Sequence, residues 1–432
     1  MPDAPTIFGL PAERGRWGLI ALGLLINLCL GSIYSWSVFV APLAAHFTAT
    51  LGREVTAGEV LLPFSVFLAF FAIAMPLAGK YIERYGPRKV TVAGGLLTGL
   101  GWLLASTATS VEALYVVYGV IGGLGVGIAY GAPVAVAARW FPDRRGLAVG
   151  LTLLGFGVSA FVTANAAGAL IAAYGVMTTF AIFGVVLAAV LVVAALPLRF
   201  PPAGWHPAGW SAPAPGTGTA PACECDRRAM LRTGTFYGLF ACYFVGCLAG
   251  LTAISIAKPV GTEVAGVDAG LATLLVGFFA IFNGAGRPAF GGLADRISPQ
   301  KTAMLTFGLI AAASVLIWLV PGVPAYIVSF AVLWGCLGGW LAIAPAATAS
   351  YFGTCDYPRC YGVVFLAYGA GAITGPQLAG FVRTATGTYL GVFPLVAALA
   401  VVGFIVAWLL MRPPTGVQAS AEEEGRRLTP SP

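Results

Sequence analysis

A single arginine stands inside a strongly apolar stretch of the sequence. Arg287 follows Asn283 by one helical turn within the run 269–293, so both side chains should share one helix face. A guanidinium offers a planar fork of N–H donors that matches a carboxylate. In hydrocarbon its charge is costly unless it faces an anion or water. We therefore predict that Arg287 anchors a carboxylate and that Asn283 hydrogen-bonds the same carboxylate or a 2-hydroxyl.

The alternative partner for Arg287 is an acid of the protein itself, in a structural ion pair. No aspartate or glutamate lies clearly within the middle of a long apolar run. The charged turn that follows Arg287 is two helical turns away, roughly 12 Å. The sequence therefore favours an anion that arrives from outside the chain.

The composition requires a membrane. Of the 432 residues 59% are hydrophobic and only 9% are charged, and the mean hydropathy is +0.90. Soluble domains carry roughly 25% charged residues. Long unbroken apolar runs, without the alternation of barrel strands, indicate helical spans. We expect an all-α membrane protein surrounded by a lipid bilayer.

The apolar runs predict twelve spans of about 20 residues each. Their limits are 17–40, 60–80, 90–109, 112–138, 146–171, 177–198, 235–258, 269–293, 302–320, 324–350, 361–381 and 386–411. The stretch 199–234 is rich in Pro, Gly, Ala and Thr, so we expect a flexible cytoplasmic linker. It separates an N-terminal half, 1–198, from a C-terminal half, 235–411, and the polar tail 412–432 is expected to be disordered.

The positive charges give the orientation. Of the 23 lysines and arginines, Arg287 lies inside a span and only Arg53, Lys258 and Arg383 fall on the side away from the termini. The positive-inside rule then places both termini in the cytoplasm. This placement explains the net charge of +7 without nucleic acid as a partner. We expect a multi-pass protein of the plasma membrane, the inner membrane in a bacterium, that works as a monomer.

A charged turn occurs twice in the chain. The stretches 79–89 and 291–301 share the pattern G-x-x-x-[DE]-R-x-[GS]-P-x-[RK], each at the cytoplasmic end of a predicted span. The repeat indicates two related halves, and its proline ends the helix. Charges that only fix topology would need no set spacing, so we predict a latch between helices that holds one conformational state. Its predicted members are Glu83, Arg84, Arg88, Asp295, Arg296, Arg139 and Arg145.

These features resemble the major facilitator superfamily, in which the motif follows spans two and eight. The chain departs from the usual pattern at Glu83, where family members have aspartate. The segments 34–36, 139–150 and 283–287 are similar to those of oxalate–formate antiporters and monocarboxylate transporters. The resemblance covers nearly the whole length. It implies two pseudo-symmetric six-helix halves that rock about a central site and expose it alternately to each side.

The resemblance also implies the lining of that site. In oxalate antiporters a lysine of span eleven supplies a second cation, and Tyr368 takes its position here. One cation matches one carboxylate, so we predict a small monocarboxylate such as lactate or pyruvate rather than oxalate. The expected aromatic neighbours, each of which would otherwise be a core residue, are Tyr34, Tyr130, Phe156, Phe365 and Tyr368.

The coupling ion is predicted less directly. In many eukaryotic monocarboxylate carriers an aspartate holds the place of Asn283 and is thought to accept the proton. Without that aspartate, the proton acceptor is expected to be an outer carboxylate such as Glu263 or Asp268, near outer helix ends, or no single side chain. We predict proton symport, and an anion antiporter of the oxalate–formate type is the alternative.

Other classes of protein fit the sequence less well. A membrane sensor that binds the acid without moving it is the rival from a different class, but the loops and tail hold no recognisable signalling domain. An enzyme is disfavoured because no nucleophile–base set appears, and a channel because one charge anchors two related halves. With only two histidines and a lone CxC at Cys223 and Cys225, we expect no metal site and no cofactor.

Overall fold

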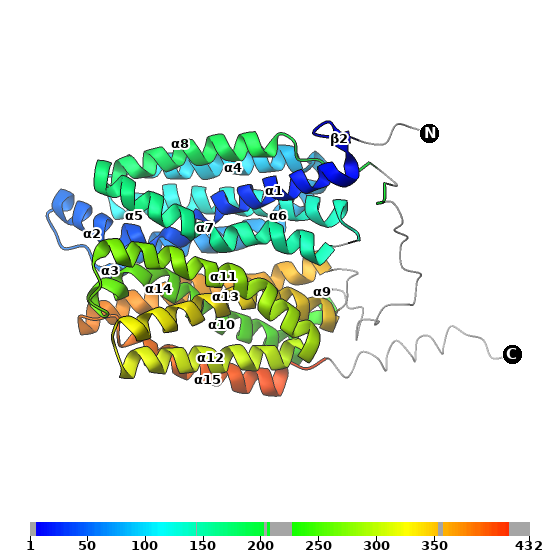
Figure 1. Ribbon diagram of the computed structural model, residues 1–432. Helices are drawn as coiled ribbons and strands as arrows, with labels where there is room; N and C mark the ends of the chain where they lie inside the picture. The colour runs from blue at the N-terminus through cyan, green and yellow to red at the C-terminus, as the bar shows by residue number, and fades with distance from the viewer. Residues whose placement is uncertain (1–5, 144, 203–204, 208–226, 353–356, 414–432) are drawn as a thin grey trace.

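The computed structural model describes residues 6–143, 145–202, 205–207, 227–352 and 357–413. These residues form a bundle of long helices, and the all-helical prediction is confirmed (Figure 1). The helices of the first half are α1 (Ala12–Leu30), α2 (Ser37–Leu51), α3 (Ala57–Tyr85), α4 (Pro87–Ala105), α5 (Val111–Leu114), α6 (Gly123–Trp140), α7 (Arg145–Tyr174) and α8 (Val176–Ala195). Those that follow are α9 (Arg227–Met230), α10 (Gly234–Glu263), α11 (Ala269–Ile297), α12 (Pro299–Leu319), α13 (Val323–Phe352), α14 (Tyr357–Thr386) and α15 (Val392–Leu410).

The bundle has two layers of helices. Figure 1 shows α1, α2 and α4 to α8 on one side and α10 to α15 on the other, with α3 of the first half beside α14 at the boundary. Two helix pairs join the layers along much of their length, α3 with α14 and α7 with α11. The first turn of α1 and the last turn of α15 lie at the same end of the bundle, here called the terminal face; the opposite end is the far face (Figure 1).

The structure contains all but one of the twelve predicted spans as helices that meet the length and hydropathy of a membrane span. Among the described residues, eleven helical segments are long and apolar enough to cross a membrane. The predicted span 90–109 is missing from these. Its helix, α4, has 19 residues and packs against α6 and α8, but Arg88 and Lys89 in its first turn lower its hydropathy. Length and packing therefore remain consistent with twelve spans.

The first span is longer than predicted and is not one regular helix. The sequence placed it at 17–40, but helix continues from Ala12 to Leu51 with a 3₁₀ segment, η1, at Gly31–Ser35. At Gly31 a Cβ atom would lie 2.6 Å from the carbonyl oxygen of Phe156, so the backbones of η1 and α7 touch. The helix ends where Gly52 takes a φ of 66°, which favours glycine.

A pair of short strands and the start of the predicted linker lie at the terminal face. Two short strands, β1 (Thr6–Ile7) and β2 (Leu10–Pro11), form an antiparallel pair before α1. The start of the predicted linker packs against α6, because Trp140 Nε1 donates to the carbonyl of Arg199 at 2.7 Å. The Arg139 guanidinium lies 3.9 Å from the centre of the Phe200 ring. Most of the linker and most of the tail, 208–226 and 414–432, lie outside the described residues.

Helices α11 and α13 approach each other closely at the depth of Arg287. A Cβ atom at Gly286 would overlap the carbonyl of Gly335, and one at Gly338 would overlap the carbonyl of Asn283. Glycines allow this contact because backbone meets backbone. The close approach fixes the part of α11 that carries Asn283 and Arg287.

A substitution tests this contact. Gly338→Ala should lower the free energy of unfolding by about 1–3 kcal/mol, because the added methyl group overpacks the α11–α13 contact. Gly308→Ala in α12 is the matched control, since a Cβ there meets no atom within 4 Å. Thermal unfolding of the purified variants should show a lower melting temperature for Gly338→Ala alone. Equal melting temperatures would contradict the packing described here.

Candidate functional site

Arg287 lies in the middle of α11 and faces α7 of the other layer. The side chain is 6% exposed, and its Nη1 donates to the carbonyl of Leu153 at 3.1 Å. Its Cζ lies 5.9 Å from the centre of the Phe156 ring. The Tyr130 hydroxyl lies within hydrogen-bonding reach of the guanidinium, and the Tyr34 hydroxyl also lies near it. The guanidinium thus sits at the boundary between the layers, among aromatic side chains.

The hydrogen bonding of Arg287 is incomplete. Nε and Nη2 are buried and make no hydrogen bond with a described residue. No described carboxylate forms an ion pair with the guanidinium. A buried donor without a partner is costly, and a charged one more so. These two N–H groups are therefore suited to an anion that enters the site.

The predicted aromatic side chains come together around a residue that was not predicted, Phe71 of α3. The Phe71 ring centre lies 5.2 Å from that of Tyr130 and 5.9 Å from that of Phe156. It also lies 5.7 Å from Phe365 and 5.9 Å from Tyr368, both of α14. Phe71 thus bridges the layers. Span two holds several phenylalanines, and no motif marks this one.

A hydrogen bond between two tyrosines links the two layers near Arg287. The hydroxyls of Tyr34, in η1, and Tyr368, in α14, are 3.1 Å apart and buried. Tyr34 also packs edge-on against Phe156, with ring centres 5.0 Å apart. Together with the Arg287–Leu153 bond, this pair joins the two layers across the centre.

Asn283 is turned differently from the expectation. Its Nδ2 donates to the carbonyl of Trp334 at 3.1 Å, and its Oδ1 is buried without a described partner. The side chain is fully buried against α13, which the contact at Gly338 brings close. The spacing predicted one shared face for Asn283 and Arg287, but Asn283 meets α13 and Arg287 meets α7. Asn283 therefore supports α13 with the amide group that was expected to face the substrate.

The two acids predicted as proton acceptors have other partners. Glu263 Oε2 accepts from Arg383 Nε at 2.7 Å. Asp268 Oδ1 accepts from the backbone N–H groups of Gly270 and Leu271, at 2.9 and 3.0 Å, and so caps α11. Both lie at the far-face ends of their helices, away from Arg287.

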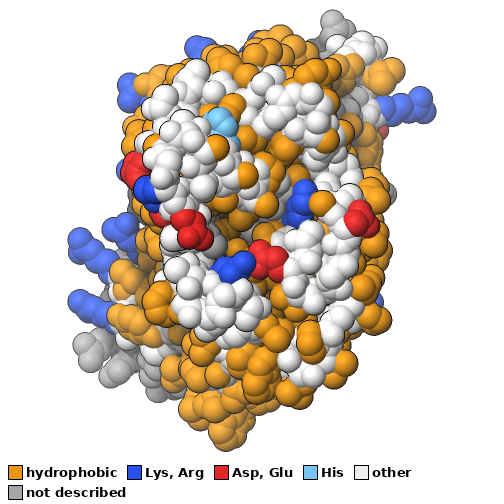
Figure 2. All heavy atoms as spheres, turned by 90° about the vertical axis from the view of Figure 1, so that its left-hand side faces the viewer, with side chains coloured by type: hydrophobic (Ala, Val, Ile, Leu, Met, Phe, Trp, Pro, Cys, Tyr) orange, Lys and Arg blue, Asp and Glu red, His pale blue; other side chains and the backbone are white. Residues whose placement is uncertain are grey.

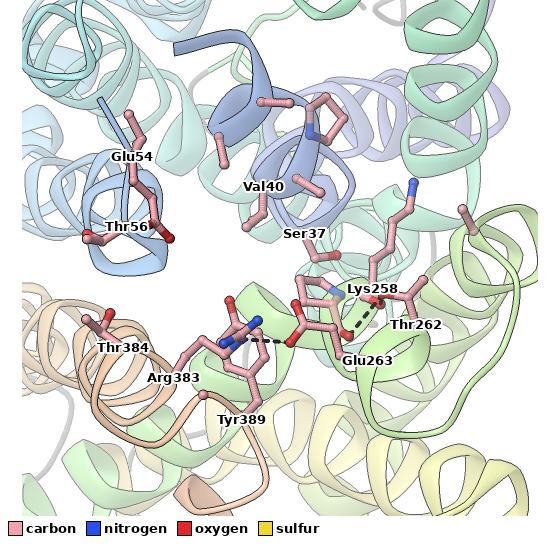
Figure 3. Close-up of a pocket in the computed structure, with 18 residues that line it drawn as sticks. Ser37, Val40, Glu54, Thr56, Lys258, Thr262, Glu263, Arg383, Thr384 and Tyr389 are labelled. Carbon is pink, nitrogen blue, oxygen red and sulfur yellow. Dashed lines mark hydrogen bonds and ion pairs between the residues drawn. The ribbon is translucent and has the colours of Figure 1, made fainter. Parts of the chain in front are cut away.

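The far face is hollowed. A cavity of about 950 Å³ lies between α2, the loop before α3, α10 and α14, and is called the far-face cavity here. Figure 2 looks onto this face and shows basic and acidic side chains around the hollow. Its lining includes Ser37, Ala45, Glu54, Lys258, Glu263 and Arg383. Figure 3 shows Lys258 and the Arg383–Glu263 pair on the α10 and α14 side of the cavity.

Comparison with known proteins gives the family. The model described as Major Facilitator Superfamily matches residues 20–351 and 239–432. The chain belongs to the major facilitator superfamily. Members of this superfamily are transporters and not enzymes, so the chain is a multi-pass membrane transporter. The resemblance seen in the repeated motif is thereby confirmed.

Within the superfamily, the chain is similar in sequence to several carriers. The chain is 28% identical to an oxalate:formate antiporter of Oxalobacter formigenes, over 91% of this chain and 90% of the antiporter. It is 28% identical to monocarboxylate transporter 13 of Bos taurus, over 90% and 88%. Apicoplast pyruvate carrier 1 of Toxoplasma gondii is 26% identical, over 82% and 81%. The chain is therefore a major facilitator transporter related to these carriers.

A solved structure shows the same fold. It is a bacterial homolog of the human lysosomal transporter Spinster, in an inward-facing and unoccupied conformation. The TM-score is 0.64 at 16% sequence identity, over 96% of this chain and 99% of that one. The likeness supports the major facilitator fold with its two pseudo-symmetric halves.

The superfamily motif lies at the terminal face, at the ends of α3 and α11. Arg84, Arg88 and Arg296 are exposed there. The side chains of Glu83, Asp295 and Arg145 lie outside the described part of the structure. The predicted latch stays a prediction, because its acids are among these three residues.

Proposed function

We propose that this transporter carries a small monocarboxylate, of the lactate or pyruvate kind, by alternating access and together with a proton. The observation that carries the proposal is Arg287, buried between the layers with two N–H groups unused. A carboxylate would complete its hydrogen bonds and neutralise its charge. The relatives named as monocarboxylate and pyruvate carriers support this class of substrate.

The lining of the centre supports a substrate with one charge. Phe156 lies beside Arg287, and Phe71, Phe365 and the Tyr34–Tyr368 pair extend this lining as apolar surface and hydroxyls. A second carboxylate would be buried there without a cation, which is costly. A 2-hydroxyl or 2-oxo group would instead find hydroxyls to bond. We therefore place the carboxylate on Arg287 and the other oxygen near the tyrosines.

Energetics favour coupling to a proton. We place the termini in the cytoplasm, with the far face outside the cell and Glu83, Asp295 and their basic neighbours forming a latch inside. Import of an anion then opposes an inside-negative potential, at about 2.3 kcal/mol per charge and 100 mV. The carbonyl of Leu153 and the Phe156 ring partly shield the empty Arg287, which would let the carrier return without an anion. A proton that travels with the acid makes the cycle neutral.

Anion exchange is the second candidate. The two unused N–H groups of Arg287 favour it, because an empty carrier would have to close over them. The similarity to an oxalate:formate antiporter points the same way. In exchange, a second anion would occupy Arg287 on the return path.

Uptake of labelled lactate into proteoliposomes tests the proposal. With an acidic exterior, wild-type protein should accumulate lactate in vesicles that contain none, and the interior should acidify as lactate enters. The control is the same protein at equal pH on both sides, where uptake should stop at equilibrium. Uptake that requires internal lactate and ignores the pH gradient would show exchange, and no uptake of any monocarboxylate would contradict the proposal.

A further inference from the structure

The far-face cavity holds a cation that the central site does not use. Lys258 lies in α10, half-buried in the cavity wall, and makes no ion pair or side-chain hydrogen bond with a described residue. Figure 3 shows its amine extending away from Glu263. The other basic residue of the cavity, Arg383, is occupied by Glu263 at 2.7 Å. Lys258 is thus the uncompensated positive charge among the described cavity residues on α10 and α14.

A second polar group faces the same space. Ser37, at the start of α2, is 1% exposed and lines the cavity, and its Oγ has no hydrogen-bond partner among the described residues. A buried hydroxyl normally finds a partner. An ammonium with free donors and a hydroxyl with a free donor are groups that a carboxylate accepts from.

The position of these groups links them to the centre. Ser37 follows Tyr34 by about one turn, and the Tyr34 hydroxyl is hydrogen-bonded to the Tyr368 hydroxyl near Arg287. On α10, Cys247 lies beside that tyrosine pair, and Lys258 is three turns further toward the far face, roughly 16 Å. An anion at Lys258 would therefore lie about three helical turns along α10 from the level of the tyrosine pair, on the far-face side.

We propose that the far-face cavity contains a second, weaker carboxylate site, formed by Lys258 Nζ and Ser37 Oγ, where the substrate is held before it passes to Arg287. This inference rests on the proposed function. The site lies in a wide, water-accessible cavity, so its charge acts mainly by raising the local anion concentration. Glu54 lies on the opposite wall and Glu263 is paired with Arg383, so the positive field is confined to the neighbourhood of Lys258 and the site is weak.

Transport kinetics test this capture site. Lys258→Gln should raise the KM for external lactate about three- to ten-fold with little change in Vmax, because capture is weakened and translocation is not. Lys258→Arg should retain most of the wild-type affinity. Raising the ionic strength should slow wild-type uptake more than Lys258→Gln uptake. Arg14→Gln, at an exposed arginine in the first turn of α1 on the terminal face, is the control and should leave far-face uptake unchanged.

A measurement without transport separates this inference from the proposed function. Ala45→Cys places a thiol at an exposed position of the cavity wall. In purified protein, the measured quantity is the rate of reaction with an anionic methanethiosulfonate divided by the rate with a cationic one. This ratio should be several-fold higher with Lys258 present than in the Lys258→Gln background. Millimolar lactate should slow the reaction. Thr107→Cys, exposed at the far face outside the cavity, should show neither effect, and unmodified protein gives the background from native cysteines.

Each outcome has one meaning. If wild-type protein carries lactate but Lys258→Gln changes neither KM nor thiol reactivity, the capture site does not exist. If no monocarboxylate is transported yet the anionic reagent is favoured and lactate protects the thiol, the anion site stands and the proposed function falls. A change in Vmax alone would assign Lys258 to translocation and overturn capture.

Discussion

Arg287→Ala is expected to lower monocarboxylate uptake by about 10²–10⁴-fold while the protein remains folded. The loss follows from two charge-assisted hydrogen bonds to the substrate, each contributing about 1.5–3 kcal/mol. Stability should not fall in proportion, because Nε and Nη2 of Arg287 have no described partner to lose. Initial rates in proteoliposomes and melting temperatures in detergent measure the two effects separately.

The same variant separates an anchor from a structural charge. In wild-type protein, lactate should raise the melting temperature by binding the folded state, and in Arg287→Ala it should not. Arg287→Lys should also transport poorly, since an ammonium lacks the planar fork. Arg53→Gln is the control, because Arg53 is exposed at the far face and pairs with Glu59 at 2.7 Å. Near-normal uptake by Arg287→Ala would remove the basis of the proposed site.

The burial of the one arginine within an apolar span could be predicted from the sequence. An arginine in an apolar run must face the interior of the bundle, so the depth and burial of Arg287 followed from hydropathy alone. The aromatic neighbours came from the resemblance. The structure groups Tyr34, Phe156 and Tyr368 as that resemblance implied, although their contact with a substrate is a proposal.

Features that depend on which helix lies opposite could not be predicted. Helical spacing put Asn283 and Arg287 on one face, but glycine contacts decide that Asn283 meets α13 while Arg287 meets α7. The 3₁₀ segment η1 lies in backbone contact with α7 at Gly31, and no local sequence pattern predicted it. Phe71 had no polar group or motif to mark it. Lys258 ended a predicted span, and only the fold shows that it faces a cavity.

The number of cations beside the bound substrate should decide whether the protein prefers monocarboxylates or dicarboxylates. Tyr368→Lys should raise the affinity for dicarboxylates relative to monocarboxylates by about ten-fold or more, because a hydrogen bond to a charged group contributes about 1.5–3 kcal/mol. The lysine would replace the Tyr368 hydroxyl, which lies 3.1 Å from the Tyr34 hydroxyl. Tyr34 packs against Phe156, and Phe156 lies beside Arg287. Competition by oxalate or malonate against labelled lactate measures the ratio.

Stability supplies an independent test of the same substitution. Without a dicarboxylate, Tyr368→Lys buries a second cation near Arg287, so its melting temperature should fall below that of wild type. A dicarboxylate should restore it more than lactate does, because two carboxylates neutralise two cations. Tyr368→Phe is the control: it loses the bond to Tyr34 without adding charge, so it should gain no affinity for dicarboxylates. If wild-type protein already prefers oxalate to lactate, one cation does not set the substrate's charge, and the argument from Tyr368 is wrong.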